Sequence, residues 1–145
     1  MFKHILIATD GSELAEQAAA HGLKLGKLLN ARVTAVNVTK PWATIIAGGS
    51  AVTFPYQDYE AAVANDARQV LATISQLAKT ADVTCTTIHV KDQYPAEGIM
   101  TACKDLGCDL IVMGSHGRRG LAKLFLGSEA TRVLTMSSVP VLICR

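Results

Sequence analysis

The sequence has few aromatic residues, little net charge and no long apolar run. Aromatic residues make up 5% of the 145 residues, and the net charge is +2. That charge is too small to predict binding to nucleic acid or to an anionic membrane. No run approaches the roughly 18 to 20 apolar residues of a membrane-spanning helix, and the N-terminus lacks the pattern of a signal peptide. We therefore expect a globular protein of the cytoplasm without nucleic-acid or membrane partners.

Cysteine pairs at metal-binding or redox spacing are also missing. None of the four cysteines belongs to a CxxC pair, and the four histidines lie far apart along the chain. The sequence therefore predicts reduced thiols and no metal site made by the protein alone.

Two common phosphate-binding motifs are absent as well. No GxxxxGK[ST] sequence occurs, and no GxGxxG sequence follows the first apolar run. Any nucleotide site must therefore come from another part of the chain.

Five apolar runs rich in β-branched residues alternate with helical patterns. They predict strands at Phe2–Ala8, Ala31–Val38, Val83–Val90, Asp109–Met113 and Val139–Cys144. Helices are expected between them, over 12–30, 58–79, 95–107 and 128–136. The crossovers are long enough for parallel pairing, and their right-handedness favours a doubly wound sheet. We predict one α/β domain over residues 1–145, with strand order 3-2-1-4-5 and helices on both faces.

The first expected helix carries small residues at four-residue spacing. Ala18, Gly22 and Gly26 would let it lie close to the sheet, with Ser12 as its N-cap and Asn30 in the left-handed position that ends it.

One connection, Thr39–Gln57, is long for a loop inside a compact domain. Loops of this length are often lids or binding loops, or else disordered. Trp42 within it could cover a nucleotide base or could simply anchor the loop.

A glycine-rich segment follows the fourth expected strand, with the spacing G-x2-G-x9-G-S at Gly114, Gly117, Gly127 and Ser128. Gly114 and Gly117 allow positive φ and a close approach to a ligand, and successive amides can form an anion-binding concavity. The N–H groups that open the last helix favour a phosphate, and the Ser128 hydroxyl could cap that helix or donate to the phosphate. A plain glycine-rich turn is the alternative.

The first and fourth strands end together in the predicted order. Ligands of open α/β sheets bind outside the carboxyl ends of the strands, where the strand order reverses. Asp10 would face the glycine segment there and accept hydrogen bonds from a ribose or a base edge. A capping or turn role before Gly11 is the alternative for this carboxylate.

Three segments together resemble the universal stress protein family. They are Ile5–Ser12, Ile111–Gly117 and Val139–Ile143, and the resemblance extends over the whole chain. It implies a Rossmann-like fold of the adenine-nucleotide-hydrolase type. The family has a branch that binds ATP and one that does not, and the complete glycine pattern is typical of the first.

The resemblance implies where ATP, or ADP or AMP, would lie, with or without Mg²⁺. Adenine and ribose would lie by Ala8, Thr9, Asp10, Val38, Met113, Gly114 and Ser115, with Val38 against the base. The phosphates would lie among His116, Gly117, Arg118, Arg119, Gly127, Ser128 and Glu129. Glu129 stands where binders often carry a small apolar residue, and we expect it to point outward and interact with the N-terminus of its own helix. The alternative is that it points at the phosphates, which it would repel unless Mg²⁺ or Arg118 intervened.

The function predicted from this resemblance is an ATP-dependent dimeric sensor or adaptor in stress response, acting on an unknown protein partner. A slow ATP hydrolase or self-phosphorylating protein, with Ser128 as one candidate hydroxyl, is an alternative. A scaffold that binds no nucleotide is another. No catalytic residue is assigned, because the sequence offers no clear base-and-metal set for phosphoryl transfer.

The fifth expected strand predicts a homodimer. It would lie at the sheet edge, where an apolar strand invites pairing, and antiparallel pairing with its own copy closes with two-fold symmetry. The interface residues would be Val139, Val141, Leu142 and Ile143, and the family resemblance implies the same dimer. A loop or the last helix covering this edge is the alternative.

Overall fold

A five-stranded parallel sheet forms the centre of the structure, a computed structural model that describes residues 1–42, 55–118 and 125–145. Its order is β3-β2-β1-β4-β5, which confirms the prediction. The strands are β1 (His4–Ala8), β2 (Arg32–Val38), β3 (Cys85–Val90), β4 (Leu110–Gly114) and β5 (Val141–Cys144). All four pairings are parallel.

Each predicted strand begins one or two residues too early. For the fourth strand, the side chain of Asp109 suggests why. It lies before β4 and binds the backbone at the start of β1. Its carboxylate accepts the backbone N–H groups of Lys3 at 2.8 Å and His4 at 3.0 Å. The strand β4 also runs one residue further than predicted, to Gly114.

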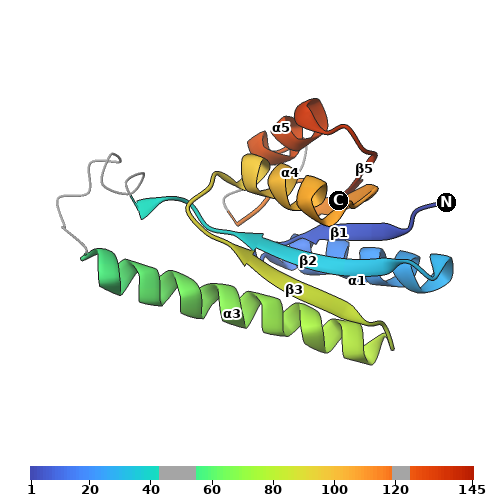
Figure 1. The fold of residues 1–145 in the computed structure, drawn as a ribbon, viewed down its shortest axis with the longest axis horizontal. Helices are drawn as coiled ribbons and strands as arrows, with labels where there is room; N and C mark the ends of the chain where they lie inside the picture. Colours follow the sequence, from blue (N-terminus) through green and yellow to red (C-terminus); the bar gives the residue numbers. More distant parts are fainter. Residues whose placement is uncertain (43–54, 119–124) are drawn as a thin grey trace.

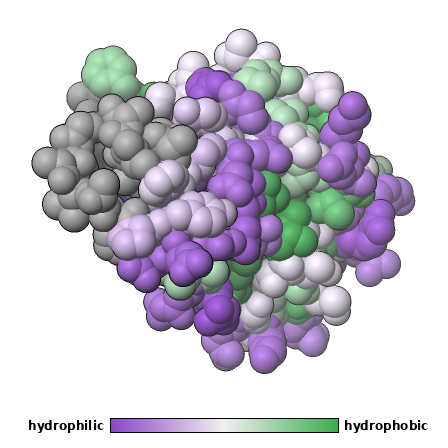
Figure 2. Space-filling model, turned by 60° about the vertical axis from the view of Figure 1, so that its left-hand side comes forward, coloured by the Kyte–Doolittle hydropathy of each residue, from purple (hydrophilic) through white to green (hydrophobic). Residues whose placement is uncertain are grey.

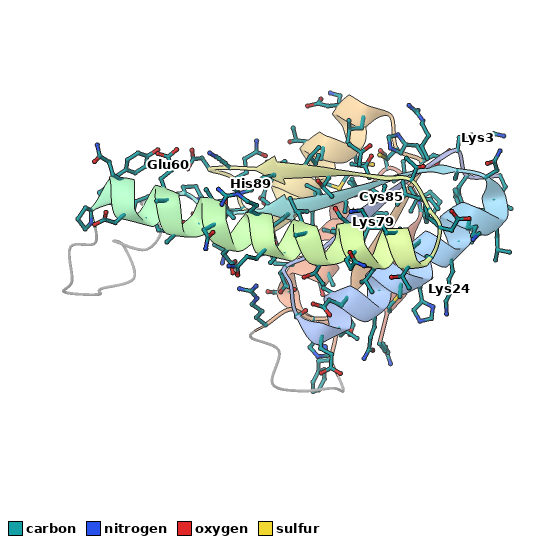
Figure 3. All side chains as sticks on the ribbon, turned by 90° about the horizontal axis from the view of Figure 1, so that it is seen from below. Lys3, Lys24, Glu60, Lys79, Cys85 and His89 are labelled. Carbon is teal, nitrogen blue, oxygen red and sulfur yellow. The ribbon has the colours of Figure 1, made fainter. Side chains whose placement is uncertain are left out.

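The helices of the described residues cover both faces of the sheet (Figure 1). Helices α1 (Glu13–Leu29) and α3 (Tyr56–Thr80) lie on one face, and α4 (Pro95–Leu106) and α5 (Ser128–Met136) on the other. The strand side chains alternate between two cores, so that Ile5 and Ile7 contact the first pair of helices and Leu6 the second. In Figure 3, α3 runs along β3 in the opposite direction, from Glu60 near His89 to Lys79 near Cys85.

Helix α1 lies against the sheet as closely as its small residues predict. A Cβ added to Gly22 would lie 2.9 Å from Ile7, and one added to Gly26 would lie 2.4 Å from Val33 Cγ2. The Ser12 side chain caps the helix by accepting the Ala15 N–H, and the C-cap Asn30 is left-handed with φ 52°. The predicted start and end of this helix are therefore confirmed.

Within the described ranges, no helix has both the length and the hydrophobicity to cross a lipid bilayer.

Candidate functional site

The carboxylate of Asp10, directly after β1, joins two loops that are far apart in sequence. Its Oδ1 accepts the backbone N–H of Ser12 at 3.0 Å, and its Oδ2 accepts that of Arg118 at 2.9 Å. Because β1 and β4 are neighbours, the turn that opens α1 and the glycine segment after β4 meet at the carboxyl ends of these strands. Asp10 thus has a turn role and also faces the glycine segment.

The residue before Asp10 is held by groups from β2. The Thr9 N–H donates to the Val36 carbonyl at 3.0 Å, and the Asn37 side-chain amide donates to the Thr9 carbonyl at 2.9 Å. Asn37 is 5% exposed, and its Oδ1 has no hydrogen-bond partner among the described residues. Asn37 was not among the predicted site residues, although a polar residue inside an apolar strand was an available signal.

Two glycines of the segment leave no room for a side chain. A Cβ on Gly117 would lie 2.2 Å from Asp10 Oδ2, and one on Gly127 would lie 2.9 Å from the Ser115 carbonyl oxygen. Neither Gly114 nor Gly117 has the positive φ that glycine would allow, whereas Gly11 does at +78°. Gly117 is needed because Asp10 lies against its backbone, while a Cβ on Gly114 would be 3.3 Å from Leu14 Cγ, a much milder contact.

The N-terminus of α5 adjoins this turn. Gly127 is its N-cap and Ser128 its first helical residue, and no side chain of the described residues caps the helix. The Gly127 N–H donates to the Ser115 carbonyl at 2.7 Å, while the buried Ser115 hydroxyl lies 3.1 Å from His116 Nδ1. The first-turn N–H groups of α5 therefore begin next to Ser115 and His116. The predicted phosphate residue Arg119 lies outside the described residues.

Glu129 points away from the glycine turn. Its Oε2 accepts the backbone N–H of Ala96, in the first turn of α4, at 2.9 Å, and its Oε1 lies 3.8 Å from Arg132. The outward orientation agrees with the expectation, but the helix N-terminus that Glu129 contacts is that of α4 and not its own.

Three of the predicted adenine residues lie on one face of the sheet. Ala8, Met113 and Val38 lie in the core beneath α4 and α5. Val38 lies against Gly98 of α4, where an added Cβ would be 2.5 Å from Val38 Cγ1. The predicted phosphate residue Arg118 extends toward α3, since its Nη1 is 3.3 Å from Asp66 Oδ2. Asp66 is 52 positions away from Arg118 in the sequence, and no sequence pattern indicated this contact.

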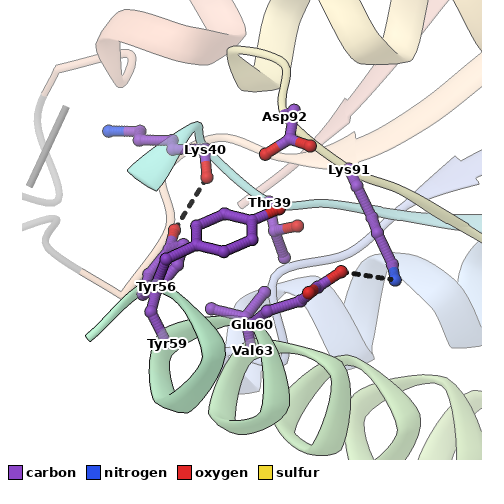
Figure 4. Close-up of a pocket in the computed structure, with 8 residues that line it drawn as sticks. All are labelled: Thr39, Lys40, Tyr56, Tyr59, Glu60, Val63, Lys91 and Asp92. Carbon is purple, nitrogen blue, oxygen red and sulfur yellow. Dashed lines mark hydrogen bonds and ion pairs between the residues drawn. The ribbon is translucent and has the colours of Figure 1, made fainter. Parts of the chain in front are cut away.

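A groove lies one strand further along, at the carboxyl ends of β2 and β3 (Figure 4). The Tyr59 hydroxyl donates to the Lys40 carbonyl at 2.7 Å, and Glu60 lies 3.8 Å from Lys91. Burial and the nearby Asp92 carboxylate raise the pKa of Tyr59. The groove is thus separate from the Asp10–Gly117 contact.

The ring of Trp42 meets that of Tyr56 edge to face, with 5.8 Å between the centroids. This contact fixes Trp42 on α3 and favours the interpretation that it anchors its loop.

The face of the molecule shown in Figure 2 is mixed in polarity, with a hydrophobic area that lies among mostly hydrophilic residues. In the described part of the chain, no three His, Cys, Asp or Glu side chains gather to hold a metal ion.

Comparisons with known proteins agree with this architecture. The model of the universal stress protein family matches residues 1–145. Universal stress protein MJ0531 of Methanocaldococcus jannaschii is 30% identical over 100% of this chain and 83% of its own length. The solved structure of the hypothetical protein MJ0577, also of Methanocaldococcus jannaschii, is 28% identical and superposes with a TM-score of 0.82, covering 99% of this chain and 96% of that one.

A third neighbour was solved with a nucleotide bound. The universal stress protein from Archaeoglobus fulgidus in complex with dAMP shares 15% identity and has a TM-score of 0.72, covering 100% of this chain and 98% of that one. At this identity the likeness concerns the fold. The family match over the whole length, the 30% identical relative and the shared sheet lead to one conclusion: the chain belongs to the universal stress protein family.

Proposed function

We propose that this chain binds an adenine nucleotide, ATP in the first place, where β1 and β4 end side by side. The observation that carries the proposal is the contact of Asp10 with the Gly117–Arg118 turn, next to the N-terminus of α5, which carries no side-chain cap from the part of the chain that the structure describes. A carboxylate that accepts from ribose and a helix N-terminus that favours phosphate are the two groups that a nucleotide needs. The complex of a family member with dAMP supports the same ligand class.

The geometry of the turn is compatible with such a ligand. Glycine at positions 117 and 127 lets Asp10 and Ser115 lie close to the turn and so keeps it next to the ends of β1 and β4. Glu129 is engaged at α4, so its charge is directed away from the phosphates. Mg²⁺ would arrive with the nucleotide and neutralise part of the phosphate charge.

Melting curves and calorimetric titration with Mg-ATP, ADP, AMP and GTP test the proposal. ATP at about 100 times its Kd should add roughly 2.7 kcal/mol to the free energy of unfolding. Nucleotide extracted from the freshly purified protein and identified by mass spectrometry gives an independent result. No shift with any nucleotide, together with an empty extract, would assign the chain to the branch that acts as a scaffold.

We further propose that the biological unit is a homodimer paired through β5. This strand is at the edge of the sheet, and its Leu142 is 40% exposed, which fits an edge that another strand covers. The interface would contain Val139, Val141, Leu142 and Ile143. In this proposal the dimer acts in the cytoplasm and presents a nucleotide-dependent surface to a protein partner.

Light scattering on the native chain and on Leu142→Pro tests the dimer. The proline removes a backbone donor from the edge, so the variant should be monomeric while its circular dichroism stays native. Leu28→Ser, which removes a leucine that is 83% exposed on α1, should remain dimeric. A native monomer, or a dimeric proline variant, contradicts the assignment.

A further inference from the structure

The side chain of Arg118 extends toward α3. It reaches over the turn after β1, where its Nη2 lies 2.6 Å from the position that a Cβ on Gly11 would occupy. Its Nη1 donates to Asp66 Oδ2 of α3 at 3.3 Å. A methyl group of Val70 occupies the same space beside Gly11, also 2.6 Å from that Cβ position. The Arg118 side chain therefore lies between the turn after β1 and helix α3, and its guanidinium forms an ion pair with Asp66.

The ion pair with Asp66 makes Arg118 less available to bind the phosphates of a nucleotide. A guanidinium binds carboxylates and phosphates through the same kind of N–H donor, so a polyphosphate that draws on Arg118 competes with Asp66 for its charge. The carboxylate left behind is then an unpaired negative charge near the nucleotide. Both consequences disfavour ligands in proportion to their phosphate charge, and neither affects a nucleoside without phosphate.

We infer that Asp66 is a specificity-determining residue of the nucleotide site, which lowers the preference for ATP over adenosine and AMP by competing for Arg118. The inference rests on the proposed function, since it concerns the same site. It assigns to α3, a helix that the glycine motif does not include, a role in selecting among adenine nucleotides. The backbone of Arg118 keeps its separate contact with Asp10, so the competition concerns the side chain alone.

The expected magnitude follows from the exposure of the pair. The two side chains are 50% and 52% exposed, and ion pairs of this kind are weak and screened by salt. Asp66→Asn should therefore tighten ATP binding by about two- to fivefold. Adenosine affinity should stay unchanged, and the gain should shrink as the salt concentration rises.

Calorimetry with adenosine, AMP and Mg-ATP on the full chain provides the test. The variants are Asp66→Asn, Arg118→Gln and the double variant, because a double-mutant cycle isolates the coupling between the two side chains. Asp105→Asn is the matched control, with the same charge change at an exposed position of α4. It should alter ATP affinity much less than Asp66→Asn does, and Asp66→Asn should give a smaller gain once Arg118 is replaced, because only the direct repulsion between Asp66 and the phosphates is then left to remove.

Three results would overturn the inference while leaving the proposed function standing. They are unchanged or weaker ATP binding by Asp66→Asn, an equal gain for adenosine, and an undiminished gain in the Arg118→Gln background. If the native chain binds none of the three ligands, the proposed function fails and this inference fails with it. Melting curves without ligand show whether each variant is folded.

Discussion

Replacing Gly117 by alanine should break the contact on which the candidate site depends. The new Cβ would lie 2.2 Å from Asp10 Oδ2, so these atoms must separate by about 1 Å to reach an ordinary contact distance. Asp10 Oδ2 accepts the Arg118 N–H at 2.9 Å, and a shift of that size takes the pair beyond hydrogen-bonding distance.

The cost can be estimated from the kind of hydrogen bond that is lost. A hydrogen bond to a charged group contributes about 1.5–3 kcal/mol, and the partly exposed position of Asp10 favours the lower end. Gly117→Ala should thus lower Tm by about 5 °C. It should also abolish most of the additional stabilisation by Mg-ATP, because Asp10 and the turn no longer share one geometry.

Differential scanning calorimetry with and without Mg-ATP measures both effects, and Asp10→Ala provides the control. In the Asp10→Ala background the obstructing oxygen is gone, so Gly117→Ala should cost little further stability. Additive losses in the double variant, or a single variant with native Tm and a native response to ATP, would refute the reasoning.

Further predictions concern packing, ligand binding, pH and thiol chemistry. Gly26→Ala should lower Tm by a few degrees, because overpacking against Val33, about 1–3 kcal/mol, outweighs the roughly 1 kcal/mol gain in helix propensity; a higher Tm would contradict the close packing. Gly127→Val should keep a native circular dichroism spectrum and lose the ATP-induced shift in Tm. Burial, aided by Arg32, lowers the pKa of His4, so the unfolded chain takes up this proton first as pH falls below about 6.5. Stability should therefore fall from pH 7 to 5, and less steeply in His4→Gln. Burial raises the pKa of Cys108 to about 12, so iodoacetamide at pH 8 should label it only after unfolding, as peptide mass spectrometry would show.

The sequence predicted the order of the strands because burial on both faces leaves a readable pattern. Each strand of a doubly wound sheet is an apolar run, and crossover handedness restricts the order in which such runs can assemble. The predicted strand order also placed Asp10 close to Gly117, because these residues follow β1 and β4, which are neighbours where the strand order reverses.

Contacts between distant side chains could not be predicted in this way. Asp66 is one of several polar residues on α3, and nothing in its local sequence distinguishes it as the partner of Arg118. The reason for which a glycine is needed could not be predicted either. Residues such as Gly117 can be required either by positive φ or by lack of space, and only the position of Asp10 shows that space is the reason.

The contact between Asp10 and Arg118 also bears on how the chain folds during synthesis. The two residues are 108 positions apart, and β1 is the middle strand of the sheet, so its pairing with β4 must wait until the later segment leaves the ribosome. Contacts of such long sequence separation form slowly, because loop closure is costly before they contribute. A nascent chain without β4 would therefore lack this nucleotide site. Nucleotide binding would become possible only once β1 is paired on both sides.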